Sequence, residues 1–211
     1  MTADAVIFDL DGVLADSRVA FSRCVNAALV AAGLSERPDA DLHRYIGPPL
    51  HATFAELTGD AALVQGCVDA YRRRYLTHSA GETTVMEGMA DAIATLAERL
   101  PLAVATSKPL PQTEPLLDAL GLLVHFTAVE GPSLTAEAEP KAETIRRALL
   151  GLPEGARPVM VGDRRFDVEG AHAHGLPCIG VLWGIGSEEE LRAAGAVVLV
   201  RTPRELLDAI L

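Results

Sequence analysis

The sequence predicts an α/β fold, a Rossmann-like parallel sheet core with an inserted small all-helical cap domain. Three observations support this prediction. A short apolar run near the start is typical of a buried strand. A long stretch with helical patterns and no convincing strand follows it. From about residue 88, strand-like runs alternate with helical runs, which is typical of a parallel sheet covered on both faces.

The first strand is expected at residues 5–10, an apolar run that ends in acidic residues. A helix is expected from residue 17 to about 32, with Gly33 as its stop. Three amphipathic helical pieces then follow, at residues 42–46, 50–57 and 62–75.

These helical pieces set the predicted domain bounds. We expect the cap domain at residues 17–82 and the core domain at residues 1–16 and 83–211. The core helices are expected at residues 88–100, 112–120, 141–150, 166–174, 188–194 and 203–211. The core strands after the first are expected at residues 102–106, 126–129, 158–161, 178–181 and 196–200.

Composition limits the possible partners. The 211 residues carry a formal net charge of -11, which disfavours nucleic acid and anionic membrane surfaces as partners. Cys24, Cys67 and Cys178 show no metal-site or disulfide pattern, and no signal peptide or membrane-spanning run is visible. We therefore expect a cytoplasmic protein. Its oligomeric state, monomer or homodimer, is left open.

Acidic side chains follow two of the expected strands. Asp9 and Asp11 lie at the end of the first strand, and Asp163 and Asp167 follow a later one. The carboxyl ends of parallel strands lie at one sheet edge, where such sheets bind ligands. Crowded carboxylates repel one another unless a cation or proton intervenes, and oxygen ligands suit Mg²⁺. A single Asp there, such as Asp167, is also a common helix cap.

Hydroxyl and ammonium groups follow a third strand. Thr106 and Ser107 end the strand at 102–106, where they either bind a phosphate oxygen or cap the next helix. Lys108 and Lys141 are the only two lysines among 18 basic residues. Either a compact ammonium is required at these positions, or lysine stands there by chance.

These motifs resemble those of the haloacid dehalogenase (HAD) superfamily of hydrolases. Residues 9–17, Asp-Leu-Asp-Gly-Val-Leu-Ala-Asp-Ser, match the opening motif, and Thr106 matches the second. Lys141 matches the third, with Lys108 as the alternative, and residues 162–167 match the fourth. The segment at 180–191 is similar to the phosphoglycolate phosphatase-like branch, which includes 5′-nucleotidases.

The resemblance implies the HAD fold and a Mg²⁺-dependent phosphomonoester hydrolase that forms an aspartyl phosphate. It implies that Asp9 is the nucleophile and that Asp11 is the general acid and base. Thr106, Ser107 and Lys141 would bind the phosphate of the substrate. The metal ligands implied by the family are Asp9, Asp11 through its backbone carbonyl, Asp163 and Asp167.

The expected substrate is a small phosphorylated metabolite, either phosphoglycolate or a nucleoside 5′-monophosphate. Two alternatives stay open: a phosphomutase of the same superfamily, similar to β-phosphoglucomutase, and a non-catalytic phosphate-binding protein. A phosphorylation-switch protein of the receiver type is disfavoured, because its phosphoacceptor lies on a middle strand and its chain is much shorter.

Overall fold

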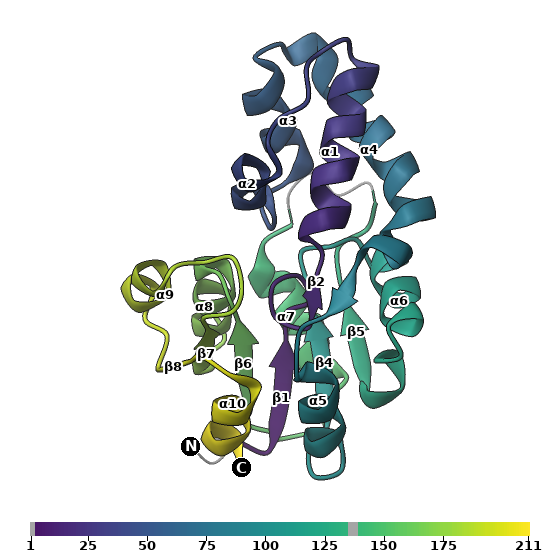
Figure 1. Ribbon diagram of the computed structural model, residues 1–211. Coiled ribbons are helices and arrows are strands. Elements are labelled where there is room, and N and C mark those ends of the chain that lie inside the picture. The colour runs from purple at the N-terminus through teal and green to yellow at the C-terminus, as the bar shows by residue number, and fades with distance from the viewer. Residues whose placement is uncertain (1–2, 135–138) are drawn as a thin grey trace. The chain divides into compact units, whose positions relative to one another are not determined.

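The chain forms two compact units, seen in the computed structural model that describes residues 3–134 and 139–211 (Figure 1). One unit comprises Met1–Ala15 and Val85–Leu211, and the other comprises Asp16–Thr84. We call them the sheet unit and the helical unit. Within the described ranges, no helix is both long and apolar enough to cross a membrane.

The sheet unit is built on six strands whose hydrogen-bonded neighbours all run parallel, in the order β5-β4-β1-β6-β7-β8. The strands are β1 (Ala5–Phe8), β4 (Leu102–Ala105), β5 (Ala128–Glu130), β6 (Pro158–Gly162), β7 (Cys178–Val181) and β8 (Val198–Val200). The α/β parallel-sheet prediction is confirmed.

Helices cover both faces of this sheet. They are α5 (Met89–Ala97), α6 (Leu110–Ala119), α7 (Lys141–Leu150), α8 (Arg165–His172), α9 (Glu188–Ala194) and α10 (Pro203–Ile210), with the short 3-10 helix η2 (Leu123–His125). Successive strand residues point to opposite faces. Ile7 accordingly packs in one core cluster with Ile145 of α7, and Phe8 packs in the other with Ile93 of α5.

Strand β1 is the point where the strand order reverses. The chain adds β4 and β5 on one side of β1 and then returns to add β6, β7 and β8 on the other. Phe8 at the end of β1 pairs with Val104 of β4 and with Val161 of β6. The residues that follow β1, β4 and β6 therefore meet at one edge, the usual ligand position in open α/β sheets.

The helical unit contains α1 (Arg18–Ala31), α2 (Asp39–Leu42), η1 (His43–Tyr45), α3 (Leu50–Thr58) and α4 (Ala61–Glu82). Its centre is aromatic. The centroid of the Tyr71 ring lies 5.7 Å from that of Phe21, 6.3 Å from that of Phe54 and 5.5 Å from that of Tyr75. Such rings supply a large apolar area in a small helical bundle.

Two features of the helical unit differ from expectation. Helix α4 ends at Glu82 and not near residue 75, because the buried Ser79 and the Arg74–Glu82 ion pair extend it. The two-residue strands β2 (Ala15–Asp16) and β3 (Thr84–Val85), which pair with each other, were not anticipated. Runs of two residues carry no periodic signal.

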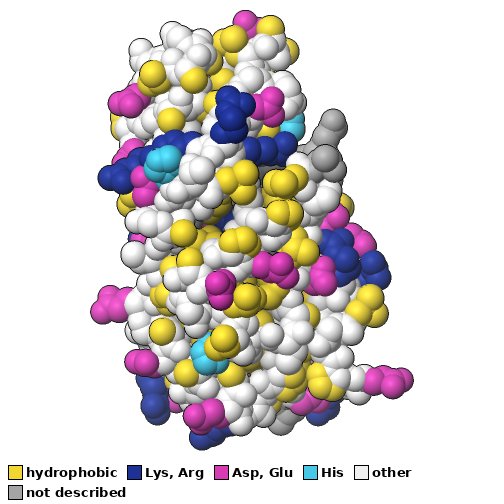
Figure 2. All heavy atoms as spheres, turned by 90° about the vertical axis from the view of Figure 1, so that its right-hand side faces the viewer, with side chains coloured by type: hydrophobic (Ala, Val, Ile, Leu, Met, Phe, Trp, Pro, Cys, Tyr) yellow, Lys and Arg dark blue, Asp and Glu magenta, His cyan; other side chains and the backbone are white. Residues whose placement is uncertain are grey.

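Acidic and basic side chains are interspersed with apolar ones on the face shown in Figure 2. Many arginines of the described chain pair with acids close by, as Arg146 does with Glu143 at 2.7 Å and Arg192 with Glu188 at 2.7 Å. These pairs are exposed, so each contributes little to stability.

Candidate active site

Asp9 and Lys141 form the centre of the site. Asp9 directly follows β1, and its backbone N–H donates to the carbonyl of Val161 at 3.0 Å, which extends the β1–β6 ladder by one residue. Lys141 is the first residue of α7 and is 8 % exposed. Its Nζ lies 2.8 Å from Asp9 Oδ1 and 2.7 Å from Asp167 Oδ1. One ammonium group therefore bridges an acid at the end of β1 and an acid in the first turn of α8.

Asp163 follows β6 and Asp167 lies in the first turn of α8, and both are almost fully buried. Asp167 caps α8, because its Oδ2 accepts the backbone N–H groups of Asp163 at 3.2 Å and of Arg164 at 3.1 Å. Asp163 Oδ2 accepts the backbone N–H of Ile185 at 2.6 Å. Asp167 thus combines the expected cap with a position in the site.

Burial shapes the electrostatics of this cluster. Burial, opposed by Lys141 and reinforced by Asp167, raises the pKa of Asp9 to about 6. Burial and the nearby carboxylates of Asp167 and Asp9 raise the pKa of Asp163 well above its ordinary value. Burial acts to lower the pKa of Lys141, but the charges of Asp167 and Asp9 outweigh it and hold that pKa above its usual range. Without a further cation, the acids favour protons.

Asp11 and Lys108 form a second ion pair. Lys108 Nζ lies 2.9 Å from Asp11 Oδ2, and both side chains are largely buried. Thr106, buried at the end of β4, accepts the backbone N–H of Lys108 through its Oγ1 at 3.1 Å. Ser107 is exposed, and the described residues include no hydrogen-bond partner for its side chain.

A glycine-lined cradle surrounds Asp163. A side chain at Gly12, which has a φ of +85°, or at Gly184 would overlap the Asp163 side chain, and one at Gly186 would overlap its carbonyl oxygen. The indole N–H of Trp183 donates to the carbonyl of Val13 at 3.2 Å. The loop after β7 therefore supports both acid-bearing turns.

The carboxylates fit a divalent metal ion. Asp9, Asp163 and Asp167 each offer an oxygen, and these oxygens lie within 4.8 Å of one another. Asp163 Oδ1 is buried, with no hydrogen-bond partner in the described part of the chain. Counting Asp11, four carboxylates face two ammonium groups, a formal excess of two negative charges that matches a divalent cation.

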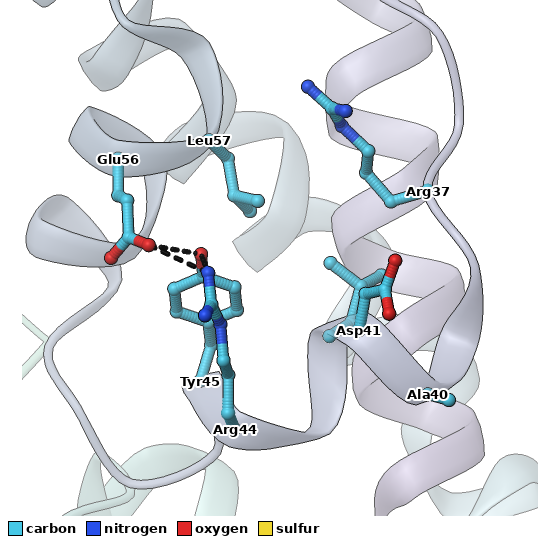
Figure 3. Close-up of a pocket in the computed structure, with 8 residues that line it drawn as sticks. Arg37, Ala40, Asp41, Arg44, Tyr45, Glu56 and Leu57 are labelled. Atoms are coloured by element: carbon cyan, nitrogen blue, oxygen red, sulfur yellow. Dashed lines mark hydrogen bonds and ion pairs between the residues drawn. The ribbon is translucent and has the colours of Figure 1, made fainter.

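The helical unit has a pocket of its own, of about 560 Å³ (Figure 3). Tyr45 and Arg44 from η1 meet Glu56 of α3 there: Tyr45 Oη donates to Glu56 Oε1 at 2.7 Å, and Arg44 Nη2 lies 2.8 Å from the same oxygen. Arg37 lines another side of the pocket. The Arg44 and Glu56 side chains are 68 % and 62 % exposed, so the network is solvated.

The fold and site together define a class of α/β protein: a parallel sheet whose reversal point presents clustered acids, a hydroxyl and lysines for metal and phosphate chemistry. The model of the haloacid dehalogenase-like hydrolase family matches residues 6–181. The chain belongs to this family, and it is a phosphatase-like hydrolase. The predicted resemblance and the enzyme class are confirmed. Enzymes of this family use a divalent metal.

The relatives carry different names. A 5′-nucleotidase from Pseudomonas aeruginosa is 38% identical over 191 residues, covering 89% of this chain and 86% of its own. The tyrosine-protein kinase PtkA of Mycobacterium tuberculosis is 35% identical, covering 97% and 72%. A phosphoglycolate phosphatase from Yersinia pseudotuberculosis is 30% identical, covering 97% and 92%.

Solved structures share the fold of this chain. The crystal structure of a predicted phosphatase from Clostridium acetobutylicum has a TM-score of 0.90 and 33% identity, and covers 99% of this chain and 98% of its own. The prediction of the HAD fold with a helical insert is therefore confirmed.

The structure brings most of the predicted site residues together. Asp9, Asp163, Asp167 and Lys141 form one cluster, and Asp11 lies outside the carboxylate triad, paired with Lys108. The family motif calls for one lysine, either Lys141 or Lys108, and the structure places both among the acids. The support from residues 183–186 was not anticipated, although their match to the family branch marked this segment.

Proposed function

We propose that this enzyme is a Mg²⁺-dependent phosphomonoester hydrolase that acts through an aspartyl phosphate on Asp9. The observation that carries the proposal is the pairing of Asp9 with Lys141 beside a carboxylate cluster suited to a divalent cation. The substrate is a small phosphorylated metabolite, phosphoglycolate or a nucleoside 5′-monophosphate. The names of two relatives, a 5′-nucleotidase and a phosphoglycolate phosphatase, support that choice.

In the first step, an Asp9 carboxylate oxygen attacks phosphorus as the bond to the leaving oxygen breaks. Lys141 offsets the negative charge of Asp9, and its ammonium is placed to hold a phosphoryl oxygen. Thr106, which is buried at the end of the neighbouring strand, holds another through its hydroxyl. Ser107 is the further candidate for a substrate contact.

Asp11 acts as the general acid and base. It gives a proton to the leaving oxygen in the first step and takes one from the attacking water in the second, when the bond between Asp9 and phosphorus breaks. Two buried acids two residues apart, each beside its own lysine, support these separate roles.

Mg²⁺ would be held by Asp9 and Asp163, with Asp167 and the Asp11 backbone carbonyl in support. When bound, the ion screens the repulsion between the anionic nucleophile and the anionic phosphate. Asp167 Oδ1 also lies 2.7 Å from Lys141 Nζ. Asp167 therefore orients the ammonium group of Lys141, whether or not Asp167 is itself a metal ligand.

Two further observations bear on the compartment and the partners. The three cysteines are buried thiols and none forms a disulfide, which supports a reducing compartment such as the cytoplasm. The formal charge of -11 supports a small metabolite as the partner and disfavours nucleic acid.

Phosphate release from a panel of monoesters, with Mg²⁺ and with EDTA, tests the proposal. The panel contains phosphoglycolate, nucleoside monophosphates, sugar phosphates and phosphotyrosine. The last is included because one relative is named a tyrosine-protein kinase. Magnesium-dependent release that disappears in Asp9→Asn is the expected result. Activity that depends on a sugar bisphosphate would favour the phosphomutase, and binding without turnover would favour a phosphate-binding protein.

A further inference from the structure

We propose that Lys108 is a positioning residue for Asp11, which holds one oxygen of that carboxylate so that the other transfers the proton. The inference deepens the proposed function and rests on it. It assigns the two lysines separate roles: Lys141 serves the nucleophile, and Lys108 serves the acid.

The contact itself is specific. Lys108 Nζ lies 2.9 Å from Asp11 Oδ2, with side chains 8% and 14% exposed, so solvent and salt screen the attraction weakly. Asp11 Oδ1 is buried, and no hydrogen-bond partner for it lies in residues 3–134 or 139–211. Lys108 therefore fixes Oδ2, and Oδ1 is the oxygen left to carry the proton.

The backbone of Lys108 is held on both sides. Its N–H donates to Thr106 Oγ1 at 3.1 Å, and its carbonyl accepts the hydroxyl of Thr113 at 3.2 Å. The loop after β5 packs so closely that a side chain at Gly131 would overlap the same carbonyl. A flexible surface lysine would need none of these contacts. This turn is therefore built to hold the residue in place.

Lysine usage gives an independent argument. The chain has 18 basic residues, and only Lys108 and Lys141 are lysines. Both side chains are under 10 % exposed and contact site acids, whereas arginines such as Arg146 pair with acids on the surface. An ammonium group is compact and bonds in several directions, which suits a crowded site better than a planar guanidinium.

The chemistry explains why the position of Asp11 matters. The proton leaves Asp11 Oδ1 as the bond between phosphorus and the leaving oxygen breaks and the bond to Asp9 forms. In the second step a water proton passes to Asp11 while water oxygen bonds to phosphorus and Asp9 is released. A displaced Asp11 should slow esters whose leaving oxygen needs the proton and spare those whose leaving group departs as an anion.

The test compares two esters in single-turnover experiments on the full chain with Mg²⁺. The leaving group of phosphoglycolate is an alkoxide, which needs a proton in order to depart. The leaving group of p-nitrophenyl phosphate is p-nitrophenolate, which departs as an anion without one. Lys108→Met should slow aspartyl-phosphate formation from phosphoglycolate by about 10- to 100-fold, and from p-nitrophenyl phosphate by less than about 3-fold. Breakdown of the intermediate should slow equally after either ester, because the intermediate is the same.

Three further variants make the outcome decisive. Lys108→Arg keeps the charge and should recover part of the phosphoglycolate rate. It also serves as the test variant if thermal unfolding shows that Lys108→Met is not folded. Lys141→Met should slow both esters alike, and Arg146→Met, on the exposed face of α7, should change neither.

Two results would overturn the inference. Equal slowing of both esters in a folded Lys108 variant would assign Lys108 to phosphate binding or structure and leave the proposed function intact. Absence of magnesium-dependent turnover of every monoester in the panel, nucleoside monophosphates included, would overturn the proposed function, and the role of Lys108 with it.

Discussion

Lys141 Nζ lies 2.8 Å from Asp9 Oδ1, which joins the start of helix α7 to the end of strand β1 through a buried ion pair. The same ammonium contacts Asp167 at 2.7 Å. Removing one member of such a cluster leaves charges buried without compensation.

Lys141→Met should therefore destabilise the protein by about 3–5 kcal/mol, because Asp9 and Asp167 lose their shared cation. Urea unfolding in EDTA measures the effect. The matched control is Arg146→Met on the same helix, whose partner Glu143 is exposed, and it should cost no more than about 1 kcal/mol. Equal effects of the two changes would mean that the buried pair contributes no more than a surface pair.

Asp9→Asn should abolish turnover, by at least about 10³-fold, and leave the fold intact. The amide cannot form the acyl phosphate. It is tolerated in the structure because burial already disfavours the charged form of Asp9 and raises its pKa to about 6. Phosphate release and thermal unfolding of the same preparation measure both effects. Retention of near-normal activity in this variant would exclude Asp9 as the nucleophile.

Gly12→Ala should destabilise the protein more than Gly33→Ala. Both glycines have φ near +80°, so both changes carry a backbone cost of about 1–2 kcal/mol. Only at Gly12 does the added methyl group also overlap a side chain, that of Asp163, whereas Gly33 has open space. The overlap should add about 1–3 kcal/mol and reduce activity. Equal free energies of unfolding for Gly12→Ala and Gly33→Ala would show that the residues around Asp163 can move aside without loss of stability.

The stability of the metal-free protein should depend on pH through Asp9. Its folded pKa of about 6 exceeds the ordinary 3.8, so the folded state holds a proton that the unfolded state has lost between these values. This stabilisation, about 3 kcal/mol, is complete below about pH 4 and disappears as the pH rises through about 6. The difference in unfolding energy between the unmodified protein and Asp9→Asn, measured in EDTA, isolates it. A difference that grows with pH would contradict the assignment.

Magnesium should stabilise the protein more at pH 7.5 than at pH 5. Burial raises the pKa values of Asp9 and Asp163, so protons compete with the ion at low pH. The rise in melting temperature on adding Mg²⁺ measures this competition. Asp163→Asn should greatly reduce the rise at both pH values, and a full rise in that variant would place the ion elsewhere.

Local patterns in the sequence predict much of this structure. Helix α7, with its helical period, and strand β7, a short apolar run, have the expected bounds. The acids at the strand ends were recognisable because parallel topology gathers them at one edge, as Asp9 and Asp163 show.

Other features depend on tertiary contacts and were not predictable from local patterns. The extension of α4 to Glu82 depends on Arg74, and the separate partners of Lys108 and Lys141 depend on which acid each can reach. The division of the chain into a core domain at residues 1–16 and 83–211 and a cap domain at residues 17–82 remains a prediction, as do the chemical roles of the site residues.

The paired strands β2 and β3 carry the chain out of the sheet unit at Ala15 and back into it at Val85. Because these strands are hydrogen-bonded to each other, the two ends of the helical insertion start side by side. An insertion whose ends are already joined adds little loop-closure entropy to the fold that receives it. A change in the length of the helical unit should therefore cost the sheet unit little stability, and the carboxylates and lysines of the candidate site all lie in the sheet unit.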